Sequence, residues 1–538
     1  MKFLKKTLLI LASGLLVGTL SGCGKKDEPK KQKDPLVIPT VDVENLQVTL
    51  PDYPTYNQGE IRSEGDYDYI DLYEVSDFHG AVDFKESSSG EAYPGLARLA
   101  TYFNNKRSHN PGGTLLLSSG DMFQGSADSN STRGYMVNYC MNYMGFDAMA
   151  IGNHEFDWTD TWIRKNANLT YNTRKIPYLG INILDKNTHE LPDFCSKSTI
   201  VERGDYKIGI IGAIGSELET SILQSCVANY DFVAEAQLIN DEADRLRAED
   251  GCDVVVLIEH QGVDSIVGVE KVDAIFGGHA HQSVSKTNEF GKPAVATKNY
   301  GRGIGHIELK INKTTKEVSV GAEPAVYSFT NADKEGIAEN AGIKSIMNQY
   351  APAINSIKNI ELATAKDDLL IDGALKKICT KTMYDAASEA LAASDLQKLD
   401  IIASFHNVSG GIRDDIKAGT VTYGSVYSAF PFDNEVVLVR AKGTAIKKKF
   451  DNSSVKNLGV YRTFDGKKDI VNDQYYYYAT TDFLALSEDI FNLQDANLIR
   501  TGAVVRDIVA ERIYNLDELQ SSDFPNTFNY QNIPASWM

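Results

Sequence analysis

Short apolar runs alternate with longer amphipathic stretches from Tyr69 onwards. Runs rich in Val, Ile and Leu are typical of buried strands, whereas apolar residues that recur every three or four positions indicate helices. We expect strands at Tyr69–Val75, Thr114–Ser118, Ala148–Ile151, Ile176–Ile183, Lys207–Ala213, Asp253–Ile258 and Ala274–Phe276. Helices are expected between them at Tyr93–Asn105, Thr132–Met144 and Ala234–Glu249. This alternation, followed by a β-rich stretch at Ala294–Ser328, predicts an α/β sandwich over residues 67–330.

A second group of elements follows a polar segment of helical propensity, Asn331–Lys358, so we expect an interdomain helix or hinge at 331–360. The second domain, also α/β, is expected at 361–525, which leaves a C-terminal tail at 526–538. Its predicted elements are a helix at Ala374–Ala393, strands at Asp400–Ser404, Glu435–Ala441 and Tyr475–Thr480, and a late helix at Val504–Tyr514.

The first 23 residues have the layout of a secretory signal peptide. Lysines precede an apolar run, Thr7–Leu20, which is too short for a comfortable membrane span. The run ends in Leu20-Ser21-Gly22-Cys23, which resembles the bacterial lipobox, where the cysteine is lipidated and becomes the mature N-terminus. An ordinary signal peptide with an incidental cysteine is the alternative. We expect residues 1–23 to be a lipoprotein signal, and the protein to be extracytoplasmic and anchored to the bacterial cell membrane through Cys23.

Composition adds a linker and excludes one class of partner. Residues 24–66 are rich in Lys, Asp, Pro and Gln and lack apolar periodicity, so a flexible linker is expected there. The 538-residue chain has a formal net charge of −19. This charge argues against general nucleic-acid binding, which needs clustered Lys and Arg. Five of the six cysteines lie after Cys23, and their spacing allows one or two disulfides without assigning them.

Five short polar motifs, each just past a predicted strand, contain five of the nine histidines. In order they are Asp77-Phe78-His79-Gly80, Gly120-Asp121, Gly152-Asn153-His154-Glu155-Phe156-Asp157, Glu259-His260-Gln261-Gly262 and Gly278-His279-Ala280-His281. An extended backbone would point Asp77 and His79 to one side, and the same holds for His279 and His281. Singly, such motifs are more often hydrogen-bonded loops, turns or helix caps. Because histidine is a common metal ligand, the five together predict a metal site.

With these motifs the chain resembles the calcineurin-like metallophosphoesterases, and among them the 5′-nucleotidase/2′,3′-cyclic phosphodiesterase family. The family pattern has a serine where this chain has Glu259, and the resemblance runs from Tyr69 to about Ile513. It implies a four-layer α-β-β-α metallophosphoesterase sandwich, an interdomain helix and a second α/β domain that binds substrate. It also implies two divalent metal ions, and the mixed ligand set suits Mn, Zn, Fe or Co without choosing among them.

The resemblance assigns a role to each polar motif residue. The first metal would be held by Asp77, His79 and His281, the second by Asn153, His260 and His279, and Asp121 would bridge them. Two such cations clamp a phosphoryl group and activate a water for in-line attack. His154 would stabilise the developing charge or protonate the leaving oxygen, and Asp157 would orient its imidazole. The spacing is reasonable because residues three apart share a helical face, although Asp157 could also be a helix N-terminal charge.

The second-domain motif is Ser409-Gly410-Gly411-Ile412-Arg413. Gly410 and Gly411 would let the backbone approach an anion that Arg413 grips, although a Gly-Gly turn with a surface arginine is the alternative. By the resemblance, Phe432 and Phe483 would sandwich a nucleobase and Asp489 would meet the sugar hydroxyls; either phenylalanine could instead belong to the core.

This second domain departs from the family pattern in three places. Val408 stands where the family usually has an asparagine, and Asn407 is displaced by one position. The later loop reads Leu486-Ser487-Glu488-Asp489 instead of Asn-Gly-Gly-Asp. The helix before Ala386 lacks the arginines that normally join Arg413, and the lysines there (Lys376, Lys377 and Lys381) are not interchangeable with a guanidinium fork.

The resemblance therefore implies a metal-dependent phosphoric ester hydrolase that converts nucleoside 5′-monophosphates to nucleoside and phosphate. Nucleotide-sugars, 2′,3′-cyclic nucleotides and non-nucleotide phosphoesters are alternative substrates. A non-catalytic lipoprotein that binds metal or nucleoside is an alternative of another class, against which His154 and Asp157 argue because neither adds to metal affinity. The sequence leaves open the native metals, the preferred base, the oligomeric state and whether the domains rotate.

Overall fold

The computed structural model describes residues 33–56, 58–87, 89–450, 453–463, 470–487, 490–494 and 497–524. The chain divides into two compact units, and each is described by itself. The N-terminal unit is Val41–Asn355, and the C-terminal unit is Ser356–Met538 together with Met1–Thr40. Cys23, Asp489 and the expected tail at 526–538 lie outside the described residues.

The N-terminal unit is built from short strands and mostly short helices. Its strands are β1 (Ser63–Glu64), β2 (Tyr67–Glu74), β3 (Lys85–Glu86), β4 (Ala92–Tyr93), β5 (Thr114–Ser118), β6 (Ala148–Ala150), β7 (Tyr178–Leu179), β8 (Ile183–Asp185), β9 (Ser198–Arg203), β10 (Tyr206–Ile214), β11 (Tyr230–Phe232), β12 (Val254–His260), β13 (Ala274–Gly277), β14 (Val284–Thr287), β15 (Pro293–Ala296), β16 (Gly303–Asn312), β17 (Val318–Val320) and β18 (Ala325–Ser328). Its helices are α1 (Gly95–Arg107), α2 (Ala127–Asn130), α3 (Tyr135–Met144), α4 (Thr159–Ala167), α5 (Gln224–Val227), α6 (Ala236–Ala248), α7 (Asp333–Gly336) and α8 (Ala341–Lys358), with 3-10 turns η1 (Val43–Asn45), η2 (Asn153–Trp158) and η3 (Ser216–Ser221).

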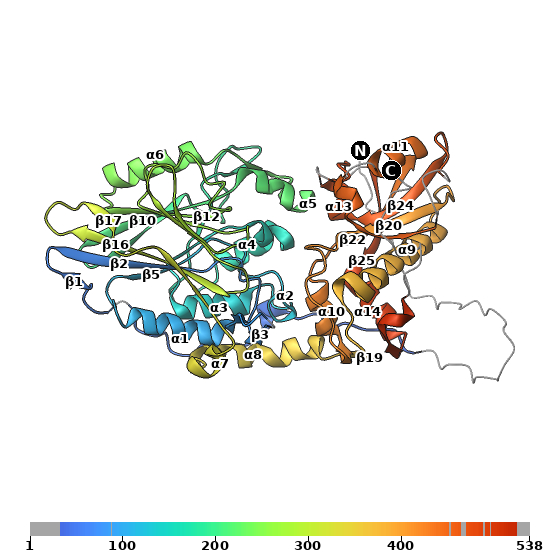
Figure 1. Cartoon of the computed structure of the whole chain (residues 1–538), viewed down its shortest axis with the longest axis horizontal. Coiled ribbons are helices and arrows are strands. Elements are labelled where there is room, and N and C mark those ends of the chain that lie inside the picture. The colour runs from blue at the N-terminus through green and yellow to red at the C-terminus, as the bar shows by residue number, and fades with distance from the viewer. Residues whose placement is uncertain are drawn as a thin grey trace. The chain divides into compact units, whose positions relative to one another are not determined.

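Two sheets pack face to face in this unit. The first has the order β17-β16-β2-β5-β6-β7, with β1 beside β2 and β18 beside β16, and the second has the order β14-β15-β13-β12-β10-β9. Fully buried side chains from both sheets, such as Leu115 and Phe276, meet between them. Helices α1, α3 and α8 cover the outer face of the first sheet and α6 covers that of the second (Figure 1). The expected four-layer α-β-β-α sandwich is confirmed.

The predicted strands correspond to observed strands except at 176–183, where the chain is divided into β7 and β8. Strand β8 leaves the main sheet and pairs with β11. The side chain of Asn182 fixes this departure, because its amide donates to the Ile214 carbonyl at 2.6 Å and its oxygen accepts from the Ile214 amide at 3.1 Å.

The expected flexible linker at 24–66 extends too far. Val43 is buried in the core of the N-terminal unit, and Leu46, Val48 and Leu50 pack against that core. The Gln349 side chain donates to the Thr49 carbonyl at 2.6 Å, and β1 pairs with β2. Residues 41–66 therefore belong to the unit. The segment is rich in Pro and Asp, but its apolar residues Val43, Leu46, Val48 and Leu50 recur every two or three positions and make this packing possible.

The C-terminal unit has a five-stranded sheet of order β23-β20-β24-β22-β25 and a three-stranded sheet of order β21-β19-β26. Its strands are β19 (Glu361–Ala365), β20 (Ile401–His406), β21 (Gly419–Thr422), β22 (Glu435–Lys442), β23 (Gly459–Arg462), β24 (Tyr475–Thr481), β25 (Leu498–Val504) and β26 (Glu518–Leu519). Its helices are α9 (Lys376–Ala393), α10 (Tyr423–Ala429), α11 (Gly443–Phe450), α12 (Ser453–Lys456), α13 (Asp482–Leu486) and α14 (Val505–Tyr514).

The segment expected as an interdomain helix forms α7 and α8, and the chain passes from one unit to the other within α8, at Asn355/Ser356. Ile343, Ile346 and Tyr350 of α8 are buried in the core of the N-terminal unit. In the described part of the chain, no helix has the length and apolar character needed to cross a membrane. Among the same residues, no disulfide joins Cys140, Cys195, Cys226, Cys252 and Cys379.

Candidate metal centre and substrate-binding residues

The five polar motifs meet because parallel strands end at a common edge. Strands β2, β5 and β6 are parallel neighbours in one sheet, and β12 and β13 are parallel neighbours in the other. The loops after β2 and β5 continue this pairing, since the Asp77 amide donates to the Gly120 carbonyl and the His79 amide to the Asp121 carbonyl, both at 3.0 Å. Side chains that follow different strands are thereby brought to one place.

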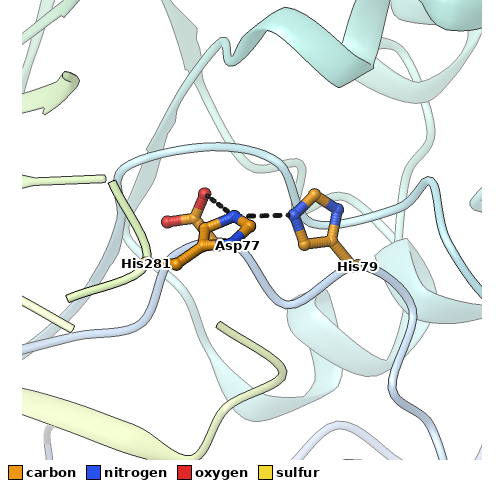
Figure 2. A group of neighbouring side chains, drawn as sticks. All are labelled: Asp77, His79 and His281. Atoms are coloured by element: carbon orange, nitrogen blue, oxygen red, sulfur yellow. Dashed lines mark hydrogen bonds and ion pairs between the residues drawn. The ribbon is translucent and has the colours of Figure 1, made fainter. Parts of the chain in front are cut away.

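Asp77, His79 and His281 form the first group of candidate ligands (Figure 2). Their ligand atoms all lie within 4.8 Å of one another. Nε2 of His281 lies 3.2 Å from Oδ1 of Asp77 and 3.2 Å from Nε2 of His79. Three groups from two distant segments thus converge as the sequence predicts.

The second group converges on one amide oxygen. Oδ1 of Asn153 lies 2.9 Å from Nε2 of His260 and 3.1 Å from Nδ1 of His279. Oδ2 of Asp121 lies 3.2 Å from Nε2 of His260, and the ligand atoms of Asp77, Asp121 and His260 lie within 4.8 Å of one another. The two carboxylates therefore lie where the two ligand groups meet.

The backbone at the candidate ligands is not extended, contrary to the expectation for the Asp-x-His and His-x-His pairs. Five candidate ligands have positive φ: Asp77 (50°), His79 (48°), Asp121 (55°), His279 (63°) and His281 (56°). Left-handed backbone is uncommon outside glycine and clusters at functional sites. It is supported here by neighbours, since the Tyr300 amide donates to the Asp77 carbonyl at 2.7 Å and the His279 amide to the Asp77 carboxylate at 3.1 Å.

These side chains fit divalent cations. Nδ1 of His79 donates to the Gln124 carbonyl at 2.9 Å, and Nδ1 of His260 donates to the Ser119 carbonyl at 2.7 Å. A carbonyl can only accept, so the proton is at Nδ1 and Nε2 is left to face the group of ligands. Imidazoles fixed in this way beside buried carboxylates are the donor set that first-row divalent metals prefer.

The charges of the centre are strongly coupled. Burial opposes ionisation of Asp121, but the charges of His260 and His154 outweigh it and hold the pKa of Asp121 well below its usual range. Burial would likewise lower the pKa of His260, yet Asp121 raises it to about 10. Burial and the charge of His260 lower the pKa of His279 to about 4. A cation would take the place of the His260 proton, because both partners bind metals in their deprotonated forms.

His154 lies on η2 and is held at two points. Its amide donates to Oδ1 of Asp121 at 2.8 Å, and its Nδ1 lies 2.9 Å from Oδ2 of Asp157. Residues three apart are in register on a 3-10 turn, which explains why this pair forms. The imidazole is 15% exposed, and its ring centre is 5.3 Å from that of His79. It therefore lies next to the candidate ligands, partly exposed, without belonging to either group.

Glu155 supports the centre and was not among the predicted site residues. Its Oε2 accepts from the amides of Asp121 and Gly152, both at 2.8 Å, and its Oε1 accepts from the Met122 amide at 2.9 Å. Burial, with the charge of Asp121, raises its pKa to about 7. A Cβ at Gly152 would collide with the Asp121 carboxylate, so glycine is needed there. The spacing of Gly152 and Glu155 matches a capping box, the signal that could have identified this role.

The segment after β15 also reaches the centre. The Asn299 amide nitrogen lies 3.1 Å from Nδ1 of His281, and Arg302 donates to the Asn299 side-chain oxygen. Tyr300 has a φ of 62°, and its ring centre is 5.8 Å from that of His79. These residues belong to none of the motifs, so sequence reasoning missed them.

In the C-terminal unit, two predicted substrate-binding residues lie together. The guanidinium of Arg413 is 5.2 Å from the centre of the Phe432 ring, and the Arg413 amide donates to the Ala429 carbonyl at 2.9 Å. Gly411 lies so close to Asn407 that a Cβ would collide with its side chain. Gly410 has a φ of 79°, so the Gly-Gly turn requires glycine at both positions.

Both predicted aromatic residues sit on segments held by arginines of the β25–α14 junction. Buried Arg506 donates to Asp433 at 2.6 Å and to the Tyr423 hydroxyl at 3.1 Å, which fixes the segment that carries Phe432. Arg500 donates to Asp482, the first residue of α13, at 3.1 Å. Phe483 follows Asp482, and its amide donates to the Asp482 carboxylate at 3.0 Å.

The lysines of α9 are engaged elsewhere. Nζ of Lys377 donates to the Phe524 carbonyl at 2.6 Å, and burial lowers its pKa. Lys381 pairs with Asp385 and lies 5.2 Å from the centre of the Tyr461 ring. Neither of these two lysines takes the place of the missing arginines in this conformation.

Comparison with known proteins agrees with this architecture. Residues 71–283 match the model of the calcineurin-like phosphoesterases, so the fold and the convergent motifs are those of a metallophosphoesterase. Residues 353–495 match the 5′-nucleotidase C-terminal domain. With the two domains in this order, the chain belongs to the 5′-nucleotidase family of metallophosphoesterases.

Individual relatives are distant. The chain is 26% identical to bovine 5′-nucleotidase over 395 residues, which cover 67% of this chain and 66% of the bovine protein. It is 24% identical to an apyrase of Tabanus yao over 71% of this chain and 73% of the apyrase. The structure of a 5′-nucleotidase precursor from Thermus thermophilus covers 86% of this chain and 99% of its own, with a TM-score of 0.70 and 20% identity. This last likeness concerns the fold alone.

Proposed function

We propose that the protein is an extracytoplasmic two-metal phosphoesterase that hydrolyses nucleoside 5′-monophosphates to nucleoside and phosphate. The observation that carries the proposal is the His154–Asp157 pair, 2.9 Å apart, beside two convergent groups of candidate metal ligands. A protein that only stores metal has no use for an oriented imidazole that binds none. For this reason we assign to His154 the role that the family resemblance implies, which is to stabilise the developing charge or protonate the leaving oxygen.

The chain's own residues have distinct tasks in this reaction. Two divalent cations, when bound, would neutralise the phosphoryl charge and make a bound water nucleophilic at neutral pH. Asp157 accepts a hydrogen bond from Nδ1–H of His154, so that in the protonated imidazole Nε2 is the atom that would donate a proton to the leaving oxygen. In the C-terminal unit, Arg413 would bind an anionic group and Phe432 would face a flat base.

Other phosphoesters are the closest rivals. A relative named as an apyrase is 24% identical to this chain over 419 residues. Val408 cannot make the side-chain hydrogen bonds of the usual asparagine, and Lys377 is engaged by the Phe524 carbonyl, which favours fewer polar contacts to the substrate than the family pattern implies. Nucleotide-sugars, 2′,3′-cyclic nucleotides and non-nucleotide esters are therefore kept as competing substrates.

A hydrolysis panel tests the proposal. The protein without its lipid would be offered AMP, UDP-glucose, 2′,3′-cyclic AMP, a sugar phosphate and an aryl phosphodiester. We expect AMP to give the highest kcat/KM, chelation to abolish release of phosphate, and added Mn²⁺, Co²⁺ or Zn²⁺ to restore it. If no nucleotide is hydrolysed with any of these metals, the proposal is refuted. A preference for the sugar phosphate would indicate that the natural substrate is not a nucleotide.

A conservative substitution of Arg506 tests the role of the C-terminal unit. R506K keeps a charge but cannot hold Asp433 and Tyr423 at once, so we expect KM for AMP to rise about tenfold, the effect of losing one charge-assisted hydrogen bond. A small aryl phosphate does not need the Phe432 face, so its kcat/KM should stay within about twofold of wild type. R512K on the same helix is the control. Equal losses for both substrates would contradict a role in base binding.

The location also stays a proposal. We infer that Cys23 carries a lipid that retains the protein at the outer face of the membrane. In cells that express the full chain, C23A should move the protein from the membrane fraction to the soluble extracytoplasmic fraction, as seen by immunoblotting. C379A, at a cysteine buried in the C-terminal unit, is the control. Membrane retention of C23A would refute the anchor.

A further inference from the structure

Two arginine side chains of the N-terminal unit have no acidic partner. Arg107, the last residue of α1, is 5% exposed, and Arg174 is half-buried in the segment before β7. In the part of the chain that the structure describes, no carboxylate forms an ion pair with either guanidinium. Asp147, the carboxylate whose charge acts on Arg107, is bound by Arg203 at 2.7 Å. Because arginine is almost never buried without a partner, this pair calls for one.

The two guanidinium groups meet at the loop between α3 and β6. Nη2 of Arg107 donates to the Gly145 carbonyl at 3.2 Å, and Nη2 of Arg174 donates to the carbonyl of the next residue, Phe146. A Cβ on Gly145 would lie 3.0 Å from Nη2 of Arg107 and 3.2 Å from the hydroxyl of Tyr53. The guanidinium carbon of Arg174 lies 5.8 Å from the centre of the Tyr53 ring. Tyr53 therefore borders both guanidinium groups.

Hydrogen-bond donors without an acceptor gather at this place. Four buried atoms of the cluster have no hydrogen-bond partner among the described residues: Nε and Nη1 of Arg107, Nε of Arg174 and the hydroxyl of Tyr56. The Tyr56 ring stacks on Arg107, with its centre 4.0 Å from the guanidinium carbon. Guanidinium nitrogens can only donate, and buried donors are almost always satisfied in folded proteins. The group that would complete this cluster must accept hydrogen bonds and carry negative charge.

The cluster lies at the opposite edge of the first sheet from the metal centre. Strands β5, β6 and β7 are parallel neighbours. Arg107, Gly145 and Arg174 come before these strands, whereas the candidate metal ligands Asp121 and Asn153 come after β5 and β6. The length of the strands therefore separates the two places. A ligand at the arginine cluster would depend neither on the metals nor on the proposed function.

We propose that Arg107, Arg174 and the Tyr56 hydroxyl bind a small oxyanion of the phosphate class. A guanidinium group presents its N–H donors in a fixed fork that matches two oxygens of such an anion. Phosphate accepts hydrogen bonds at each oxygen, so it would satisfy the four donors and offset the two positive charges. Tyr53 and Tyr56 are half-buried, and a movement of the segment that carries them would admit the anion. The bound anion would fix this segment to the loop before β6.

Calorimetric titration of the intact, Mn²⁺-loaded chain with phosphate tests the site. Wild type and K175Q, a control at the exposed lysine next to Arg174, should bind one phosphate more per chain than R107M/R174M. This event should persist in wild type after chelation of the metals, which removes any phosphate held at the metal centre. Sulfate should compete for it, whereas chloride at equal ionic strength should not. Equal numbers of bound phosphate in wild type and the double variant, or no event after chelation, would overturn the proposal.

The variant Y56F gives a second reading that leaves the buried charges in place. It keeps the ring that stacks on Arg107 and removes the hydroxyl, so the fold should be retained. Loss of one hydrogen bond to a charged ligand should weaken phosphate binding about tenfold and reduce the rise in unfolding temperature that phosphate causes. Y67F, at a tyrosine of the same unit that is 36% exposed, is the control. Phosphate affinity equal to that of wild type would contradict Tyr56 as a ligand. If R107M/R174M fails to fold, Y56F decides the question.

Discussion

Replacement of His154 by alanine is expected to lower kcat for AMP by about 10²–10⁴-fold while the chain keeps both metals. His154 belongs to neither group of candidate ligands, and its contact with Asp121 is made through the backbone amide, which alanine retains. The loss should therefore fall on the chemical step. Initial rates over a range of AMP concentrations, together with the metal content of the same samples, measure both effects.

Substitution of Asp157 provides the graded control. D157N keeps a hydrogen-bonding group beside Nδ1 of His154 but not the charge that favours the protonated ring, so kcat should fall less than in H154A. KM should change little in both variants because neither residue holds the base. Metal-replete H154A with a near-normal rate would refute the assignment of His154 as the proton donor.

The largest effect on stability is expected for Glu155. E155A removes the acceptor of three backbone amides in the buried loop of the metal centre. Each buried donor left without a partner costs about 1–3 kcal/mol, so the free energy of unfolding should fall by at least about 3 kcal/mol. We also expect weaker metal binding, because Asp121 lies on the loop that Glu155 holds.

Urea unfolding followed by circular dichroism, with and without added metal, measures this loss. E155Q retains one accepting oxygen and should fall between E155A and wild type. E249A, at a side chain that is 70% exposed, is the control and should change the free energy of unfolding by less than about 0.5 kcal/mol. An equally small change in E155A would mean that the three amides find other acceptors.

The convergence of the metal-centre residues was predictable because it follows from strand order. Asp77, Asp121 and Asn153 each come just after a strand, and parallel strands deliver such positions to one edge. The backbone conformation at these residues was not predictable. Asp77 and His281 reach the centre in left-handed conformations that residue spacing cannot reveal. Such conformations depend on tertiary hydrogen bonds and not on local propensity.

Other residues were missed because their partners are distant or are backbone groups. Glu155 accepts hydrogen bonds from backbone amides, so the capping-box spacing is the main sign of its role in the sequence. Asn299 meets His281 through tertiary packing, and no motif marks it. The packing of Val43 was concealed by the polar composition around it. In the C-terminal unit, the proximity of Arg413 and Phe432 agrees with the expectation, whereas their role as ligands of substrate stays a prediction.

The β25–α14 junction has a mechanical consequence. Arg500 and Arg506 are six residues apart, and they connect one rigid corner to the segments that carry Phe483 and Phe432. The amide of Val505, between them, donates to the Asn434 carbonyl at 2.9 Å and closes the corner. Because both aromatic segments are hydrogen-bonded to this one junction, a substitution that displaces the junction should move the segments that carry Phe483 and Phe432 together.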